Sequence, residues 1–214
     1  MAAEATMGLR ERKKRQTAMR IYRTAVELFL ERSFDDVSVQ EIADAADVSK
    51  MTVFNYFGTK EDLVFRPMEE HFSDAARAVR ERRRGESAAE AVRRQFLEMI
   101  EGRDPAIGLH SEPFAREIRS VILGTPVLRE RAYVLSEKGA RELAGLLAEE
   151  TGDETLAAIA AATLTAARNA LIEEHHRRIA AGESADEVAA DAADRARKAF
   201  ALVEAGLGDY ARKT

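Results

Sequence analysis

The segment SVQEIADAADVSKMTVFNYF, residues 38–57, contains the pattern that decides the fold. Ser38 and Glu41 have the spacing of a capping box, in which each side chain satisfies the other residue's backbone amide at the start of a helix. Ser49 is a second residue of the type that caps helix N-termini. The segment therefore predicts two short helices, at 39–46 and 50–56.

The residues between these two helices favour a tight turn. A helix-turn-helix needs a left-handed residue there, and Asp47 tolerates this conformation better than most side chains do. Val48 is expected to pack between the helices, and Ala43 is small enough to let them cross closely. The segment thus predicts a helix-turn-helix, the motif that places its second helix in the major groove of DNA.

The second short helix has an apolar and a polar side. We predict that Val53, Phe54 and Phe57 face the core, while Ser49, Thr52, Asn55 and Tyr56 share the outer face at helical spacing. Hydroxyl and amide groups read base edges, and Tyr and Lys contact phosphate. Lys60, expected in the first turn of the next helix, is placed to bind a phosphate. The predicted DNA contacts are Ser38, Val39, Ser49, Lys50, Met51, Thr52, Asn55, Tyr56 and Lys60.

Residues 15–64 as a whole resemble the DNA-binding domain of the tetracycline-repressor (TetR) family. The positions that carry the resemblance are Ala25, Phe29, Phe34, Val39, Ile42, Ala43, Val48, Ser49, Phe54, Tyr56, Phe57, Lys60, Glu61 and Leu63. Ser33 and Asp47 stand where the family usually has Gly. Phe54 stands where it usually has Tyr, so a contact from that hydroxyl to the DNA backbone is in doubt.

Composition bounds the rest of the chain. It has 214 residues, 33 Lys and Arg against 38 Asp and Glu, and no Cys, which excludes disulfides and thiolate chemistry. We found no uninterrupted apolar run of membrane-spanning length and no signal peptide, so a cytoplasmic location without membrane contact is expected. Residues 10–23 are strongly basic, which is either a solvated N-terminus or an arm that contacts DNA.

Helical periodicity continues to the C-terminus, and no alternating β-branched run predicts a strand. The expected fold is all-α, with a three-helix DNA-binding domain at 12–60 and a helical ligand-binding and dimerisation bundle at 61–214. The expected helices span 12–32, 39–46, 50–56, 60–83, 88–102, 105–109, 113–123, 127–150, 154–181 and 185–210. The basic cluster at 80–84 is expected to be a solvated helix end.

The resemblance implies an effector pocket among the middle helices, and apolar stripes there supply candidate residues, although such stripes are also typical of plain core. The candidates are Phe65, Met68, Phe72, Phe96, Met99, Ile100, Phe114, Ile118, Arg119, Ile122, Arg168, Asn169 and Ile172. Buried arginines need an anionic partner. This partner is either a carboxylate of the chain, such as Glu112 or Glu117, or an anionic group of the effector. A weak likeness of 112–131 to acyl-CoA-like ligand-binding domains favours an amphipathic anionic effector.

The family resemblance also implies a homodimer formed by the last two long helices. The Ala-rich segment 154–172 and the seam of Val188, Ala192, Ala196, Ala199, Val203 and Leu207 fit this role. An intramolecular hairpin would use the same seam. Two recognition helices are also what a palindromic operator in double-stranded DNA requires.

The hypothesis that follows is a repressor, released from a palindromic operator by a small-molecule effector. An activator or an effector-independent DNA-binding protein is the alternative. We expect no enzyme, catalytic residue, cofactor or metal site, because the chain has no glycine-rich phosphate loop, nucleophile elbow or clustered ligand spacing.

Overall fold

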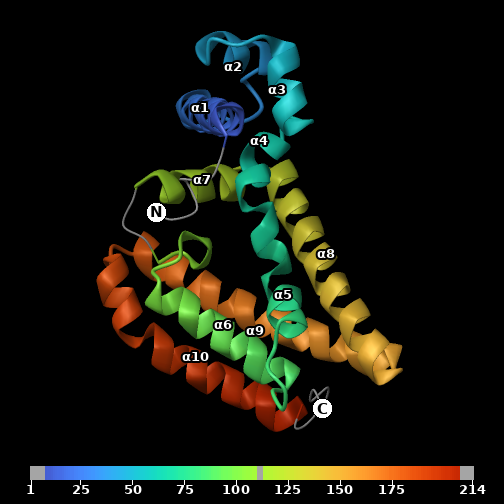
Figure 1. Cartoon of the computed structure of the whole chain (residues 1–214). Helices are drawn as coiled ribbons and strands as arrows, with labels where there is room; N and C mark the ends of the chain where they lie inside the picture. The colour runs from blue at the N-terminus through green and yellow to red at the C-terminus, as the bar shows by residue number, and fades with distance from the viewer. Residues whose placement is uncertain (1–7, 110–112, 208–214) are drawn as a thin grey trace. The chain divides into compact units, whose positions relative to one another are not determined.

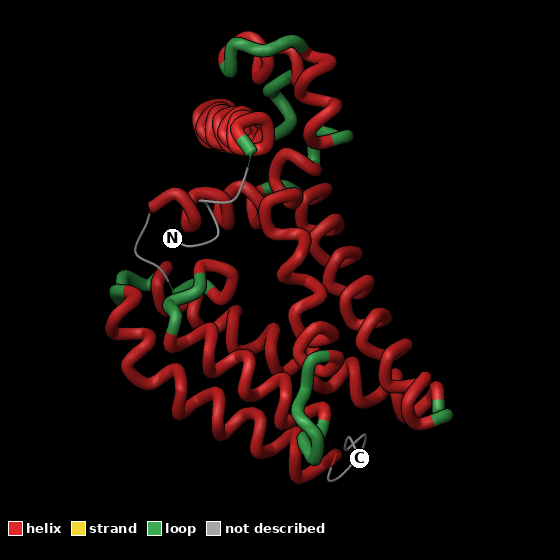
Figure 2. The backbone as a smooth tube through the Cα atoms, viewed as in Figure 1, coloured by secondary structure: helices red, strands yellow, loops and turns green. Residues whose placement is uncertain are grey.

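The computed structural model describes residues 8–109 and 113–207, and this part of the chain consists of helices and loops without a strand (Figures 1 and 2). The all-α prediction is confirmed. The helices are α1 (Leu9–Arg32), α2 (Val39–Ala45), α3 (Lys50–Phe57), α4 (Asp62–Phe65), α5 (Asp74–Arg80), α6 (Ala88–Glu101), α7 (Pro113–Gly124), α8 (Pro126–Thr151), α9 (Glu154–Ala180) and α10 (Ala185–Leu207), with 3₁₀ segments η2 (Arg66–Ser73) and η3 (Pro105–Ile107).

The chain divides into two compact units. The first contains residues up to 67 together with 116–132, and the second contains 68–115 and 133–214. This division differs from the domains expected from sequence, because α4, most of α7 and the beginning of α8 group with the N-terminal helices. The functional boundary near residue 60 stays a prediction.

The first unit is organised around the apolar stripe of α1. Ile21, Ala25 and Val26 are fully buried, and the Phe29 ring lies 4.9 Å from the Phe34 ring, centroid to centroid. Leu30 continues the sequence pattern but is exposed. Contacts of α1 with α2 and α4 then fix the short helices around this stripe.

The predicted helix starts are realised by hydrogen bonds. The side chain of Ser38 accepts from the amide of Glu41, whose carboxylate accepts from the amide of Ser38. The same box occurs at Ser87 and Glu90, at the start of α6. A third one joins Ser184 to Glu187 before α10. Each cap satisfies amides that a helix N-terminus otherwise leaves without partners.

The predicted long helix at 60–83 is wrong. The structure has α4, the 3₁₀ segment η2 and α5 in its place. Pro67 lacks the N–H that would continue the α-helical ladder, so the α-helix ends before it, although Arg66 still has helical φ and ψ angles. Eight residues is long for a 3₁₀ segment, since its hydrogen-bond geometry is poorer than that of an α-helix.

Within the second unit, α8 approaches the backbone of η2 very closely. A Cβ atom placed on Gly139 would lie 2.0 Å from the carbonyl oxygen of Phe72. No side chain other than hydrogen fits in this space, because the obstacle is backbone and cannot rotate away. Gly139 therefore sets the distance between α8 and η2.

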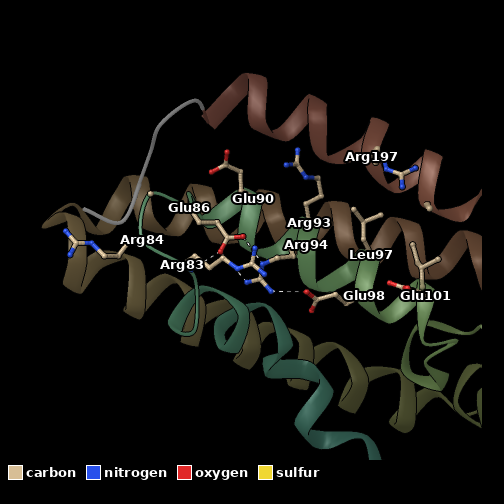
Figure 3. A pocket seen from close by; sticks show the side chains of 13 residues that line it. Arg83, Arg84, Glu86, Glu90, Arg93, Arg94, Leu97, Glu98, Glu101 and Arg197 are labelled. Atoms are coloured by element: carbon tan, nitrogen blue, oxygen red, sulfur yellow. Dashed lines mark hydrogen bonds and ion pairs between the residues drawn. The ribbon is translucent and has the colours of Figure 1, made fainter.

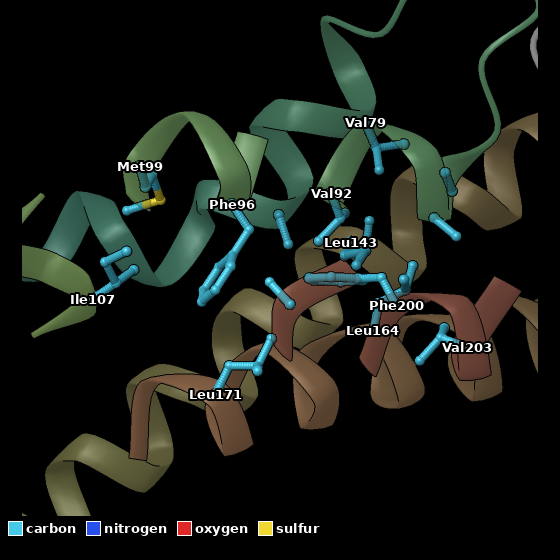
Figure 4. Packing of buried hydrophobic residues seen from close by; sticks show 14 of the residues in the cluster. Val79, Val92, Phe96, Met99, Ile107, Leu143, Leu164, Leu171, Phe200 and Val203 are labelled. Carbon is cyan, nitrogen blue, oxygen red and sulfur yellow. The ribbon is translucent and has the colours of Figure 1, made fainter. Parts of the chain in front are cut away.

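The core of the second unit is shared by α6, α8, α9 and α10 (Figure 4). Phe96 and Phe200 are fully buried, with ring centroids 5.9 Å apart, and Leu143 and Leu164 are buried in the same cluster. The helix pair α6 and α10 and the pair α9 and α10 pack along their lengths (Figure 1).

This core corrects the expectation for the α10 seam. Val188, Ala192 and Ala196 are fully buried inside the chain, and Val203 is nearly so. These four seam residues therefore pack against neighbouring helices of the same subunit and are not available to a second copy. The spacing correctly predicts one buried stripe on α10, but periodicity does not specify which helix covers that stripe.

Candidate DNA-binding surface and effector region

The turn between α2 and α3 has the backbone that a helix-turn-helix needs. Asp47 has a φ of 49°, in the left-handed region, as expected from the sequence. The amide of Val48 donates to the carbonyl of Ala43 at 3.0 Å and closes the turn. Ser33, also a departure from the family's usual Gly, has φ 78° and ψ 157°, a region that is essentially restricted to glycine.

The exposed face of α3 differs from the predicted one at Phe54. Val53 and Phe57 are buried as expected, but the Phe54 side chain is 39% exposed. Val53 and Phe57 lie one turn apart and fill the core stripe, while Phe54 is rotated 100° from Val53, out of that stripe. Lys50, Met51 and Phe54 with Asn55 therefore form the outer face of α3, which we call the recognition face.

Ser49 and Thr52 are engaged at the helix start. The Ser49 hydroxyl oxygen accepts from the amide of Thr52 at 3.0 Å and lies 2.8 Å from the Thr52 hydroxyl oxygen. Thr52 and Tyr56 are half-buried, and Asn55 is exposed. Asn55 is thus more exposed than Thr52 and Tyr56, the two other predicted polar readers within α3.

Lys60 is not in the first turn of a helix, because α4 begins at Asp62. Its ammonium nitrogen lies 4.3 Å from the centroid of the Phe34 ring and 5.9 Å from that of Phe29. This geometry is a cation–π contact. Partial burial lowers the pKa of Lys60, and the carboxylates of Asp35 and Glu61 oppose this effect. A phosphate contact by Lys60 stays a prediction.

The remaining predicted DNA contacts lie at or near the surface. Ser38 is exposed and caps α2, and Val39 is half-buried. Residues 10–15 of the basic segment lie on exposed turns of α1. The structure therefore places a capped, exposed helix and a basic helix end in the same compact unit.

The predicted pocket residues fall into both compact units. Phe65, Ile118, Arg119 and Ile122 belong to the first unit, and the other nine belong to the second. In the second unit, Phe96, Met99 and Ile100 are buried members of the core, and Ile172 packs against it. Met68, Phe72 and Phe114 are half-buried. Whether these residues line one pocket stays a prediction.

Arg168 has a carboxylate partner that the sequence did not reveal. Its Nη2 atom donates to Asp74 Oδ2 at 2.7 Å, and both side chains are buried. Asp74 also accepts from Arg77 and lies 3.3 Å from His71 Nδ1. The partner expected from the sequence was Glu112 or Glu117. Glu112 lies outside the described residues, and Glu117 belongs to the other unit.

The groups around Asp74 shift one another's protonation. Burial acts to raise the pKa of Asp74, but the hydrogen bond with His71 and the charge of Arg168 outweigh it and leave the pKa below its ordinary value. The same hydrogen bond raises the pKa of His71, although partial burial acts the other way. Near neutral pH, Asp74 is therefore an anion that neutralises the buried Arg168.

Two polar atoms on the buried side of α9, Arg168 Nε and His175 Nε2, have no hydrogen-bond partner among the described residues. His175 is fully buried, its Nδ1 lies 2.8 Å from the carbonyl oxygen of Ile107, and its ring stacks on Phe96 with centroids 6.1 Å apart. Burial lowers the pKa of His175, so it is neutral and its Nε2 is a hydrogen-bond acceptor. Asn169, by contrast, is exposed and donates to Ser136 at 3.1 Å.

The basic cluster at 80–84 is only partly solvated. Arg82 is 3% exposed, donates to the carbonyl of Val79 and forms a bidentate pair with Glu150 of α8. It therefore ties the end of α5 to α8, whereas Arg80, Arg83 and Arg84 are exposed as predicted.

An open groove of about 800 Å³ runs beside Arg83 and between α6 and α10 (Figure 3). Most of the residues that line it are charged, and several of them form ion pairs. Arg94 donates to Glu86 at 2.8 Å and to Glu98 at 3.2 Å. Because apolar lining and unpaired polar groups are typical of effector pockets, this groove does not have their character.

Comparison with known proteins identifies the N-terminal unit. Residues 21–66 match the family model described as bacterial regulatory proteins, tetR family. The HTH-type transcriptional regulator TcmR of Streptomyces glaucescens is 32% identical over 93 residues, which cover 44% of this chain and 41% of TcmR. The N-terminal part of this chain is therefore similar to the DNA-binding domain of TetR-family regulators. The match spans only about two fifths of the length of TcmR.

Solved structures of TetR-family proteins share the fold over most of the chain. NalD, the secondary repressor of the MexAB-OprM multidrug efflux pump in Pseudomonas aeruginosa, has a TM-score of 0.56 at 20% identity and covers 88% of this chain and 96% of its own. A complex of SmeT with triclosan has a TM-score of 0.58 at 16% identity and covers 89% and 91%. At these identities the likeness shows a shared fold and nothing finer.

Proposed function

We propose that this chain is a homodimeric repressor of the TetR family that binds a palindromic operator and is released by a small-molecule effector. The observation that carries the proposal is the exposed recognition face on a capped helix after a left-handed turn. Such a helix fits the major groove, where Asn55 and Lys50 reach base edges and phosphates. NalD, of the same fold, is described as a repressor.

The exposed side of α9 supports the dimer. Leu156 and Ile159 are 49% and 55% exposed, and Ala162, Ala166 and Ala170 continue the exposed stripe at helical spacing. By length and composition α9 would also pass as a membrane span, as core helices often do, yet only 33% of its apolar window is buried within one chain. A second copy packed on this side buries the remainder without requiring a membrane.

The effector region is proposed among the predicted residues of the second unit. Arg168 Nε and His175 Nε2 are buried and have no hydrogen-bond partner within residues 8–109 and 113–207. A bound molecule that supplies an acceptor to the first atom and a donor to the second would satisfy both. Asp74 already neutralises Arg168, which weakens the argument for an anionic effector and favours a neutral, mostly apolar one. The structure of SmeT in complex with triclosan is consistent with effector binding in this fold.

The test is fluorescence anisotropy of the purified protein on the DNA beside its own gene, at about 0.15 M salt with scrambled competitor, because non-specific phosphate binding weakens with salt. We expect selective binding that Asn55→Ala weakens about tenfold to hundredfold. Arg141→Ala, an exposed change on α8, serves as the control and should bind normally. Failure to select any sequence from random DNA would contradict the proposal.

Release is tested on the same complex with a library of small molecules. A true effector should lower DNA affinity and raise the unfolding temperature of the free protein, because binding to one state and release from the other are thermodynamically linked. His175→Phe should abolish the response to an effector that bonds Nε2 while retaining DNA binding. If the protein stays bound to the operator with every ligand that raises its unfolding temperature, it is an effector-independent regulator.

A further inference from the structure

The apolar side chains of the recognition face lie outside the buried core of the first unit. Met51 is 67% exposed and Phe54 is 39% exposed. The core stripe of α3 is already complete with Val53 and Phe57, which are 1% and 3% exposed. Two large apolar groups therefore project from the helix that is proposed to enter DNA, where a polar residue would be solvated more favourably.

The position of these side chains matches the groove-facing part of the helix. Met51 and Phe54 are three residues apart and lie on one side of α3. Lys50 and Asn55 flank them on the same exposed arc, and the Lys50 ammonium lies 6.0 Å from the Phe54 ring centroid. A cation for the phosphates and an amide for a base edge thus border an apolar centre.

The major groove offers one kind of apolar group to such a centre. The edges of guanine, cytosine and adenine present hydrogen-bond donors and acceptors, and thymine alone adds a C5-methyl group. We propose that Met51 and Phe54 select operator half-sites by packing against thymine methyl groups. This inference rests on the proposed DNA-binding function and names the base that the recognition face prefers.

The absence of a hydroxyl at residue 54 is consistent with this preference. Phe54 has no group that can donate a hydrogen bond to a phosphate, so it would contact DNA through its apolar surface. Within the protein, its ring contacts the ammonium group of Lys50. Burial of one methyl group is worth about a fourfold change in affinity. In a symmetric dimer, each half-site would contribute this fourfold change to the affinity for DNA.

The experiment replaces thymine by uracil, one position at a time, in the operator obtained by selection from random DNA. Uracil pairs as thymine does and lacks only the methyl group. For the native protein, we expect about fourfold weaker binding for each contacted methyl per half-site, and little change elsewhere. In Met51→Ala or Phe54→Ala, the thymine and uracil operators should bind equally at the position that the missing side chain contacts.

Asn55→Ala is the matched control, because it removes a polar neighbour and should keep the preference for thymine. Both apolar substitutions are at exposed positions, and circular dichroism would verify that the variants fold. If uracil has no effect anywhere, or if both alanine variants retain the full thymine preference, the inference is overturned while the proposed function stands. If the native protein selects no DNA at all, the proposed function itself fails.

Discussion

Asp74 is the residue on which the polar interior of the second unit depends. It is fully buried, and its partners lie on three elements: His71 on η2, Arg77 on α5 and Arg168 on α9. Removal of one member of a buried ion pair leaves the other charge without compensation. Asp74 thus fixes α9 to the start of α5 by charge as well as by packing.

We expect Asp74→Asn to lower the free energy of unfolding by about 3 kcal/mol, because the buried guanidinium of Arg168 loses its counter-charge. Urea denaturation followed by circular dichroism measures this loss. The double variant Asp74→Asn with Arg168→Met should recover most of it. Glu142→Gln, the same chemical change in the exposed pair with Arg80, should cost about 1 kcal/mol or less. Equal losses at both sites would contradict the assignment.

We also expect the stability contributed by His71 to depend on pH. Its folded-state pKa is raised above the unfolded value of about 6.5, so the contribution is fully present below that pH and is lost as the pH rises through the folded pKa. Asp104 acts in the same direction and Arg168 opposes it. The urea midpoints of the native protein and His71→Gln should therefore converge with rising pH. A constant difference from about pH 5 to about pH 9 would refute this.

At the scale of elements, the close approach of α8 to η2 is the feature most sensitive to substitution. Gly139→Ala would force a methyl group against the Phe72 carbonyl, so the two elements must separate at a cost of about 1–3 kcal/mol. Gly145 lies in the same helix and has open space around it. Gly145→Ala should therefore stabilise the protein by about 1 kcal/mol through helix propensity. Thermal unfolding of both variants gives the comparison, and a shift of the same sign in both would contradict it.

Local signals in the sequence predicted where most helices begin. They could not predict contacts between residues that are far apart in the chain. The capping boxes at Ser38, Ser87 and Ser184 mark helix starts because both partners lie within one turn. Pro67 is also a local signal, because a proline inside a helical pattern predicts that the α-helix is interrupted. The helix predicted at 60–83 did not take this into account. The pairing of Arg168 with Asp74 joins residues 94 positions apart, and no local pattern encodes such a contact.

The recognition face shows the same limit at the candidate site. Lys50, Met51 and Asn55 are exposed as predicted. Phe54 was predicted to face the core, because an aromatic residue in an amphipathic pattern is usually buried, and it is exposed instead. On an eight-residue helix, Val53 and Phe57 suffice for the core stripe. Hydrophobicity alone therefore could not distinguish this exposed residue, which we propose contacts DNA, from a residue of the core.

For the whole molecule, we expect assembly to depend on the exposed side of α9. Ile159→Glu should convert the proposed dimer to a monomer, because a carboxylate in an apolar interface is costly to desolvate. Light scattering after size-exclusion chromatography measures the mass of each form. Tyr133→Glu, at a 65% exposed position on α8, is the control and should remain dimeric. A native protein that is monomeric at micromolar concentration would contradict the proposed dimer.

The open stripe on α9 also has a consequence for protein turnover. In the proposed dimer, a subunit without a partner exposes Leu156, Ile159 and the neighbouring alanines. Since assembly follows mass action, the fraction of such subunits grows as the protein becomes scarce. Quality-control proteases act on chains with exposed apolar surface, so dilution would accelerate degradation. The lifetime of the protein would then shorten as its concentration falls. Once synthesis stops, its concentration would therefore fall faster than at a constant rate of degradation.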